Sequence, residues 1–384
     1  MKKAYNETWV ENIESQAIVR EWYEEKVLSQ EQYTEACKLF PVEFYQPNIF
    51  IEFGLFIFTN LAISATFGFM AITLLEPIVE TSLGLGIVCV VYGVSMVFLL
   101  EYFIKSRKLY RSGTDNALLY VAIGSFLTAI FAFTDFRWSL YAYYFLSLIV
   151  FIPFLLRYGD PFVAIAIFVV WICSWFTLTI EFSIGKLIVP FVIMAVSVIS
   201  FVFARWWSKN DNSAYYTDAQ ICIETGSLIT FYLGGNYMVV REGNAILNGL
   251  NDSTQISFAP LFYLFTLAIP FIYLYFGLKQ KDRKMVMVGL AAFAFSIFTY
   301  RFYFSVMPLE WAMTFGGAAL VGFAVWGIWV LRTPKWGLTY QQTQASKYRD
   351  FEAFLVNQAL PHGQGGKMKF GGGDFGGGGG GGNY

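Results

Sequence analysis

Long hydrophobic runs with almost no charge dominate this chain between residues 49 and 331. Each run is about 20 residues long, which is the length of helix needed to cross ~30 Å of hydrocarbon. The runs lack the polar stripe that a helix on the surface of a soluble protein would have. We therefore expect ten membrane-spanning helices. Their expected ranges are 49–75, 81–104, 116–134, 138–157, 162–180, 186–204, 219–240, 258–278, 285–304 and 311–331.

The composition agrees with this pattern. Hydrophobic residues make up 57% of the 384 residues and charged residues only 14%, against about 25% charged residues in a typical soluble domain. These values exclude an ordinary soluble enzyme and a disordered protein. The formal net charge of −1 gives no overall basic field of the kind that attracts nucleic acid. The predicted class is an all-α polytopic transmembrane helix bundle in a lipid bilayer, with no nucleic acid partner.

The polar segment ahead of the first run, residues 1–45, is typical of a short helical hairpin. Ser29 and Gln32 have the spacing of a capping box, in which each side chain satisfies a backbone N–H at the start of a helix. Pro41 ends the second helix, because proline lacks the N–H donor that a helix needs. A hairpin this small is only marginally stable alone, so we expect it to pack on something else.

Two polar segments follow the last expected span. Residues 332–360 contain a stripe of Tyr348, Phe351 and Phe354, which predicts an amphipathic helix. Residues 361–384 contain 13 glycines, and glycine at this density predicts a mobile tail that buries no core. We expect both segments on the same side of the membrane as the hairpin, where they would be available to a protein partner.

The distribution of Lys and Arg predicts the orientation. With ten spans, 22 of the 26 basic residues fall on the side that holds both termini. Arg137, Lys186 and Arg241 fall on the opposite side, and Arg301 lies within a span. Because loops rich in Lys and Arg stay in the cytoplasm, we expect a multi-pass protein of the cell membrane, inner or plasma, with both termini cytoplasmic.

A shift of 102 residues aligns parts of the chain with one another and predicts an internal repeat. Gly124-Ser125 meets Gly226-Ser227, and each copy would hold four spans, over 81–180 and 186–304. An even number of spans per copy makes the two copies parallel. Glycine and serine allow helices to approach closely, so Gly124, Ser125, Gly226 and Ser227 are candidates for a helix–helix interface. Pro153 and Pro270 would bend matching spans.

Glu224 is the candidate for chemistry inside the membrane. An ionisable group costs roughly 2.5–3.5 kcal/mol at the bilayer centre on insertion scales, and Glu224 lies about six residues inside its expected span. Thr225 and Ser227 follow it, so the three form a candidate proton or cation site. The alternative is a neutral carboxyl group that is hydrogen-bonded to the neighbouring hydroxyls. Arg301 lies too far from Glu224 in depth to pair with it.

Known catalytic signatures are absent from the sequence. It contains no phosphate-binding loop, nucleophile elbow, zinc-binding helix or dinucleotide fingerprint. The single histidine, His362, lies in the glycine-rich tail, and the four cysteines form no CxxC pair. We therefore expect no enzyme activity, no catalytic residues, no metal site and no cofactor.

Residues 22–32 read WYEEKVLSQEQ, a tryptophan followed by a turn and a helix start. This segment resembles the opening of a family of uncharacterised bacterial predicted membrane proteins, which begin with a cytoplasmic helical hairpin (a domain of unknown function) and continue with many spans. Lys26 stands where the turn of that family usually has glycine. The resemblance implies a location in the membrane and implies no activity.

Three functions are compatible with these features. The first is a membrane scaffold or sensor that meets cytoplasmic proteins through the hairpin and the tail. The alternative is a transporter or channel that uses Glu224. Lipid binding or lipid chemistry is the third class.

The predicted orientation places Lys105 and His362 in the same compartment. In a cysteine-free variant, a single cysteine introduced at either position is expected to resist a membrane-impermeant maleimide on intact cells and to react after permeabilisation. Labelling of one position but not the other on intact cells would contradict the ten-span topology.

Overall fold

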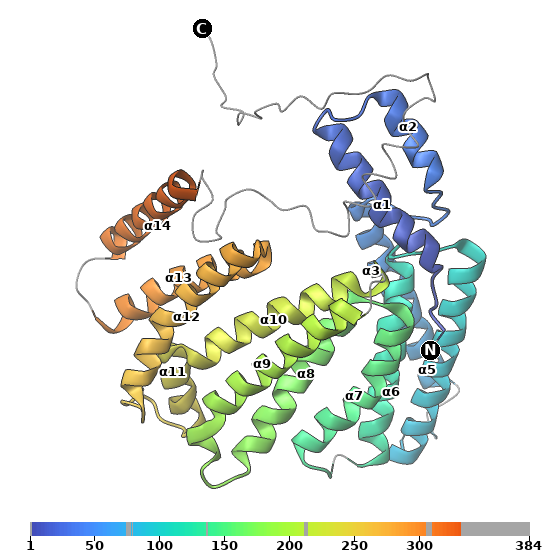
Figure 1. The fold of residues 1–384 in the computed structure, drawn as a ribbon. Coiled ribbons are helices and arrows are strands. Elements are labelled where there is room, and N and C mark those ends of the chain that lie inside the picture. The colour runs from blue at the N-terminus through green and yellow to red at the C-terminus, as the bar shows by residue number, and fades with distance from the viewer. Residues whose placement is uncertain are drawn as a thin grey trace, which may run out of the picture.

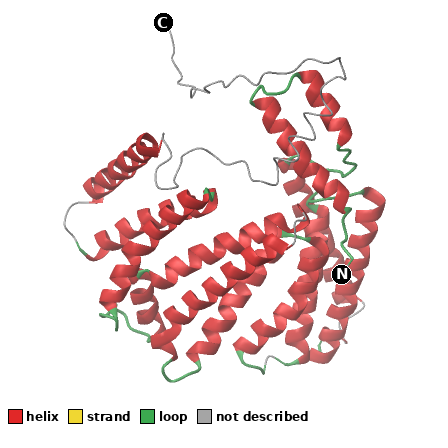
Figure 2. Cartoon of the chain, in the orientation of Figure 1, coloured by secondary structure: helices red, strands yellow, loops and turns green. Residues whose placement is uncertain are grey.

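The computed structural model of this protein describes residues 2–73, 78, 80–135, 137–210, 214–304 and 309–331. All the named elements in these ranges are helices (Figure 2), which confirms the all-α class. The predicted helix at 332–360 and the predicted tail at 361–384 lie outside the described residues.

Helices occupy all ten places where the sequence predicts spans. Eight of them, all except α10 and α14, are long and apolar enough to cross a membrane in their described residues. This number of apolar helices indicates a multi-pass membrane protein. The ten helices are α3 (Ile49–Thr73), α5 (Ser82–Arg107), α6 (Thr114–Phe133), α7 (Leu140–Tyr158), α8 (Pro161–Ile180), α9 (Gly185–Asn210), α10 (Thr217–Gly235), α12 (Ala259–Gln280), α13 (Arg283–Tyr303) and α14 (Leu309–Leu331).

The expected run 219–240 is wrong as a single helix, because the chain breaks at Asn236. Helix α10 ends at Gly235, and a separate helix, α11 (Tyr237–Leu247), begins one residue after the break. Two consecutive glycines weaken the end of α10. The Asn236 side chain then accepts hydrogen bonds from the backbone N–H groups of Met238 and Val239, which caps α11.

The predicted N-terminal hairpin is present as α1 (Glu7–Glu24) and α2 (Gln30–Leu39). Ser29 and Gln32 form the capping box that their spacing predicts. Val19, Trp22 and Ala36 are buried between the two helices and form the small core of the hairpin. The hairpin lies at one end of the bundle, which we call the hairpin end; the other is the far end (Figure 1).

Helices that follow one another in the sequence pack side by side in the bundle. The pairs are α5 with α6, α7 with α8, α9 with α10, and α12 with α13, while α3 packs on α6 and α14 on α13. Figure 1 shows the helices as a row of rods that runs from α5 on one side to α14 on the other. Short links between consecutive helices produce this arrangement.

Corresponding helices of the two expected repeats match in length and connection. Helices α5 and α9 each have 26 residues, and α6 and α10 have 20 and 19. The links from α7 to α8 and from α12 to α13 each have a left-handed residue followed by a capping aspartate, Asp160 or Asp282. These matches support the predicted parallel repeat.

The two prolines do not occupy equivalent positions in these helices. Pro153 lies about two turns before Asp160, and Pro270 lies about three turns before Asp282. If α7 and α12 are copies, the two prolines therefore bend them at different distances from the end of the helix.

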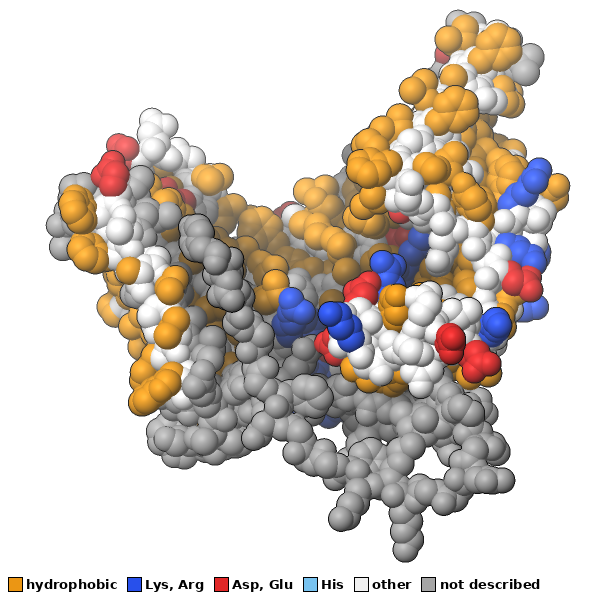
Figure 3. Space-filling model, turned by 90° about the horizontal axis from the view of Figure 1, so that it is seen from above, with side chains coloured by type: hydrophobic (Ala, Val, Ile, Leu, Met, Phe, Trp, Pro, Cys, Tyr) orange, Lys and Arg blue, Asp and Glu red, His pale blue; other side chains and the backbone are white. Residues whose placement is uncertain are grey.

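Some polar side chains are buried inside the bundle, and many large apolar side chains are exposed on its outside. Thr266 and Ser296 are buried, whereas Phe50 and Phe58 on α3 are 84% and 72% exposed. A soluble protein rarely exposes large apolar areas of this kind. Seen from the hairpin end, charged side chains cluster beside broad hydrophobic areas (Figure 3). The apolar exterior is the surface that a bilayer would cover.

Gly113, directly before α6, allows the start of α6 to lie close to α3 because it has no side chain. It has φ +88, and a Cβ atom there would lie 2.1 Å from the carbonyl oxygen of Glu52. Gly113→Ala is expected to destabilise the bundle by about 1–3 kcal/mol or more, from backbone strain and this clash. The midpoint of thermal aggregation in detergent would measure the loss.

Gly124→Ala is the matched control on the same helix, because a Cβ atom there has no atom within 4 Å. Its midpoint is expected to stay within the error of the wild type. Equal midpoints for the two variants would show that the contact with α3 does not exist.

Candidate functional site

The N-terminal segment ahead of α1 crosses the hairpin end of the bundle and is bonded to it. The backbone N–H of Ala4 donates to the carbonyl of Arg157 at 2.9 Å, and the Arg157 guanidinium donates to the carbonyl of Lys2 at 2.9 Å. The Lys3 ammonium lies 5.0 Å from the ring centre of Tyr215, within cation–π distance. The segment is therefore held at three successive residues.

Tyr5 is the residue by which this segment enters the bundle. Its ring is buried and packs edge-on against Tyr110 and Tyr158, with ring centres 5.0 and 6.4 Å away. Its hydroxyl donates to the Asp115 carboxylate at 2.9 Å. A hydroxyl that donates to a buried carboxylate makes a strong, charge-assisted hydrogen bond.

Asp115 lies in the first turn of α6, and its side chain is surrounded by donors. It accepts from the backbone N–H groups of Arg111 and Ser112, both at 2.8 Å, and from the Ser112 hydroxyl at 2.9 Å. The residue is only 1% exposed. The positive end of the α6 dipole also favours the negative charge. With Tyr5, four donors compensate this buried carboxylate.

The environment of Tyr5 keeps its hydroxyl protonated. Burial, together with the charge of Asp115 and the hydrogen bond to it, raises the pKa of Tyr5 well above its ordinary value of about 10. The hydroxyl is therefore a permanent donor at physiological pH.

Arg111 extends this arrangement to the second half of the bundle. Its backbone N–H donates to Asp115, while its guanidinium forms an ion pair with Asp218 in the first turn of α10. Tyr5, Asp115, Arg111 and Asp218 form a connected chain, which we call the hairpin-end network. It joins the N-terminal segment, the link between α5 and α6, and α10.

The hairpin itself is attached to the same link. The backbone N–H of Tyr45 donates to the carbonyl of Lys108 at 2.9 Å, and the Lys108 ammonium pairs with Glu43. The Phe44 ring stacks on Tyr110 with ring centres 4.8 Å apart. This confirms that the hairpin packs on another part of the molecule.

Glu224, the predicted site in the membrane, lies buried on α10, about two turns after the helix begins, and is 5% exposed. The Lys284 ammonium donates to its carboxylate, and the Arg205 Nε lies 3.7 Å from Oε1. Arg205 also pairs with Asp282. Two carboxylates and two cations thus meet where α9, α10 and α13 converge, and their formal charges cancel.

The partners of Glu224 are cations of other helices rather than its sequence neighbours. The Ser227 hydroxyl donates to the carbonyl of Ile223 at 2.7 Å. Among the described residues, no hydrogen bond joins Glu224 to Thr225 or Ser227. As expected, Arg301 does not pair with Glu224. Because these ion pairs join α9, α10 and α13, the cluster has the properties of a clamp between helices.

The four candidate interface residues occupy unlike surroundings. A Cβ atom on Gly226 would lie 3.0 Å from the Phe168 ring, so α8 and α10 approach closely there, and Ser227 is buried. Gly124 faces open space, and the Ser125 hydroxyl donates to the carbonyl of Val121 in its own helix. Of the two Gly-Ser pairs, only Gly226-Ser227 therefore lies where two helices approach closely.

Sequence reasoning missed Tyr5, Asp115 and Asp218. A repeated Thr-Asp pair in the sequence indicates the two aspartates. Thr114-Asp115 stands at the start of α6 and Thr217-Asp218 at the start of α10, and these are corresponding helices of the two copies. The same pair at equivalent positions indicates a shared role at the helix starts, where each aspartate receives donors from the link that contains Arg111.

Comparisons with other proteins add no identification. No family model, curated protein or solved structure matches this chain. The resemblance of residues 22–32 therefore stays a prediction. No group of three or more His, Cys, Asp or Glu side chains within the described ranges is arranged to hold a metal ion.

Tyr5→Phe keeps the ring but removes the hydrogen bond to Asp115. A bond to a charged group contributes roughly 1.5–3 kcal/mol, so the N-terminal segment is expected to open at least about tenfold more often. Hydrogen exchange at the Ala4 amide, which the docked segment protects, would measure this. Tyr23→Phe is the control, because that hydroxyl has no hydrogen-bond partner among the described residues.

The same bond predicts a dependence on pH. Because the folded pKa of Tyr5 is raised, its contribution to docking is complete below about pH 10 and is lost as the pH rises from there toward the folded pKa. A spin label on Thr8→Cys in a cysteine-free variant is expected to become more mobile above pH 10. In the Tyr5→Phe background, which lacks the titrating hydroxyl, an equally large change would contradict this assignment.

Proposed function

We propose that this protein is a membrane scaffold or sensor that presents its N-terminal hairpin, residues 1–45, to a cytoplasmic protein. The observation that carries the proposal is the insertion of Tyr5 between the helix ends and its bond to Asp115. A hairpin attached in this way follows any movement of α5, α6 and α10, because the hairpin-end network joins all three. The proposal places the hairpin end in the cytoplasm, as the sorting of Lys and Arg predicts.

The surface of the hairpin is acidic. Eight glutamates of residues 1–45 are exposed, against four exposed basic residues. The glutamates are Glu7, Glu11, Glu21, Glu24, Glu25, Glu31, Glu35 and Glu43, and the basic residues are Lys2, Arg20, Lys26 and Lys38. This excess of acid favours a partner with a basic surface, because complementary charge increases the rate and specificity of association.

A transporter that uses Glu224 has less support. Its carboxylate is paired with Lys284 and Arg205, and a cation or proton would have to displace these partners. A cavity of about 570 Å³ in the bundle is lined by other residues, such as Lys186 and Asn244, and Glu224 does not line it. The Glu224→Gln variant is accordingly expected to retain any solute flux that the wild type shows in vesicles.

Charge reversal tests the scaffold proposal in the full-length protein. A photo-crosslinking residue at position 31 in α2 is expected to capture a discrete cytoplasmic protein in living cells. Glu21, Glu24 and Glu25 changed together to lysine should lower the yield roughly tenfold or more, because each contact then becomes repulsive.

Gln30, Thr34 and Lys38 changed together to alanine form the control, since they are exposed but hold no excess acid. This variant should retain the crosslink. A yield that is unchanged by the three lysines would remove the acidic surface as the binding site. Loss of the protein from the membrane would show a folding defect instead, which its elution from a sizing column would reveal.

A further inference from the structure

A large cavity lies in the far half of the bundle, among α8, α9, α10, α11 and α12. Its volume is about 570 Å³, which is within the ~300–1,000 Å³ of pockets that hold small molecules. Hydrocarbon side chains provide most of its lining, including Phe176, Ile193, Val240 and Phe262. An apolar cavity excludes water and accepts an apolar guest.

The break at Asn236 creates the space for this cavity. Helix α11 leaves the line of α10 there, packs on α10 and α12, and has few contacts with α9. Gly243, in the middle of α11, faces the opening: a Cβ atom on it would have no atom within 4 Å. The wall that α11 forms therefore stands away from α8 and α9.

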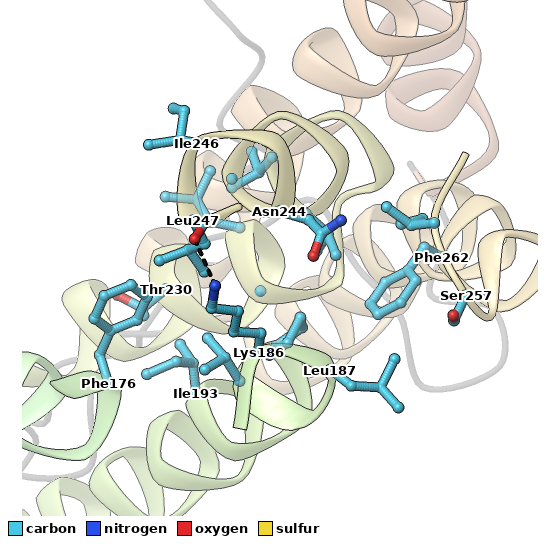
Figure 4. Close-up of a pocket in the computed structure, with 18 of the residues that line it drawn as sticks. Phe176, Lys186, Leu187, Ile193, Thr230, Asn244, Ile246, Leu247, Ser257 and Phe262 are labelled. Carbon is cyan, nitrogen blue, oxygen red and sulfur yellow. Dashed lines mark hydrogen bonds between the residues drawn. The ribbon is translucent and has the colours of Figure 1, made fainter. Parts of the chain in front are cut away.

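One cation stands at the rim of the cavity. Lys186, near the start of α9, is exposed, and its ammonium donates to the Leu247 carbonyl at 2.9 Å and to Asn248 Oδ1 at 3.2 Å. Figure 4 shows this side chain reaching toward Leu247 across the cavity rim. Among the described residues, no carboxylate lies within ion-pair distance of Lys186. The bonds to neutral acceptors leave its charge uncompensated.

The cavity is also open to the outside of the bundle. Leu187 and Ile246 line the cavity, and both are exposed on the outside of the bundle. A chain can therefore enter sideways from the hydrocarbon region, while a polar head stays at the rim beside Lys186. The charge and the shape together favour an anionic amphiphile with one long chain.

We propose that this cavity binds a long-chain fatty acid, with its hydrocarbon chain among α8, α9 and α11 and its carboxylate on the Lys186 ammonium. The volume is large enough for one long hydrocarbon chain. A carboxylate would take the free donor position of the ammonium in a charge-assisted hydrogen bond. This assignment is independent of the hairpin and of any protein partner there.

A photoactivatable C16 fatty acid tests the site in the full-length protein, reconstituted in phosphatidylcholine nanodiscs. The wild type is expected to be labelled on peptides of α8, α9 or α11, with palmitate as an effective competitor. Gly243→Phe places a ring in the open space and should lower the labelling about tenfold. Gly124→Phe, which adds the same ring to an open position on α6, should leave it unchanged.

The role of the charge is tested separately from the shape of the cavity. Lys186→Gln should weaken competition by palmitate roughly tenfold and leave competition by its methyl ester unchanged, while Lys186→Arg should resemble the wild type. The sizing-column profile of each variant confirms folding.

Three results would overturn the proposal. They are labelling spread evenly over lipid-facing helices, full labelling of Gly243→Phe, or competition by an anionic phospholipid but not by palmitate. Capture of a protein by the hairpin would be unaffected by any of them.

Discussion

A carboxylate buried in an apolar bundle requires compensation, and this requirement organises the hairpin end of the molecule. Asp115 receives four donors, one of them the Tyr5 hydroxyl from 110 residues earlier in the chain. Glu224 is compensated by Lys284 and Arg205 from two other helices. Because an unpaired charge in such a place is costly, each carboxylate fixes the elements that supply its partners. The docking of the hairpin is thus a result of the same constraint that joins α9, α10 and α13.

The two ends of the bundle differ in how their polar groups are satisfied. Charges at the hairpin end are paired with one another, so the helix ends there are held together. At the far end, the break at Asn236 is compensated by neutral groups: the Asn236 side chain donates to Tyr232 and Thr299, and the Thr266 hydroxyl accepts from the Tyr237 backbone. Lys186 keeps an uncompensated charge there, beside an apolar cavity. The paired charges and the apolar cavity therefore lie at opposite ends of the bundle.

The sequence predicts the features that depend on local patterns. The capping box of Ser29 and Gln32 and the places of the apolar helices are examples, since each depends on residues close together in the chain. The break at Asn236 was missed because Gly234 and Gly235 lie inside an otherwise apolar run, where tertiary hydrogen bonds decide whether the helix continues. The partners of Glu224 could not be predicted, because Arg205 and Lys284 lie in expected links and become neighbours only when three helices converge. Asp115 falls in an expected link because it is charged and directly precedes the apolar run at 116, although α6 already begins at Thr114.

The separation in sequence between Tyr5 and Asp115 has a consequence for biosynthesis. The hairpin leaves the ribosome before α6, which follows only after some 110 further residues, on the order of ten seconds of translation. During that interval the N-terminal segment has no Asp115 carboxylate to bind. Asp218, the partner of Arg111, is made later still, so the hairpin-end network can be completed only when α10 has been made. Its completion marks the moment at which α10 of a newly inserted chain has joined the first half of the bundle.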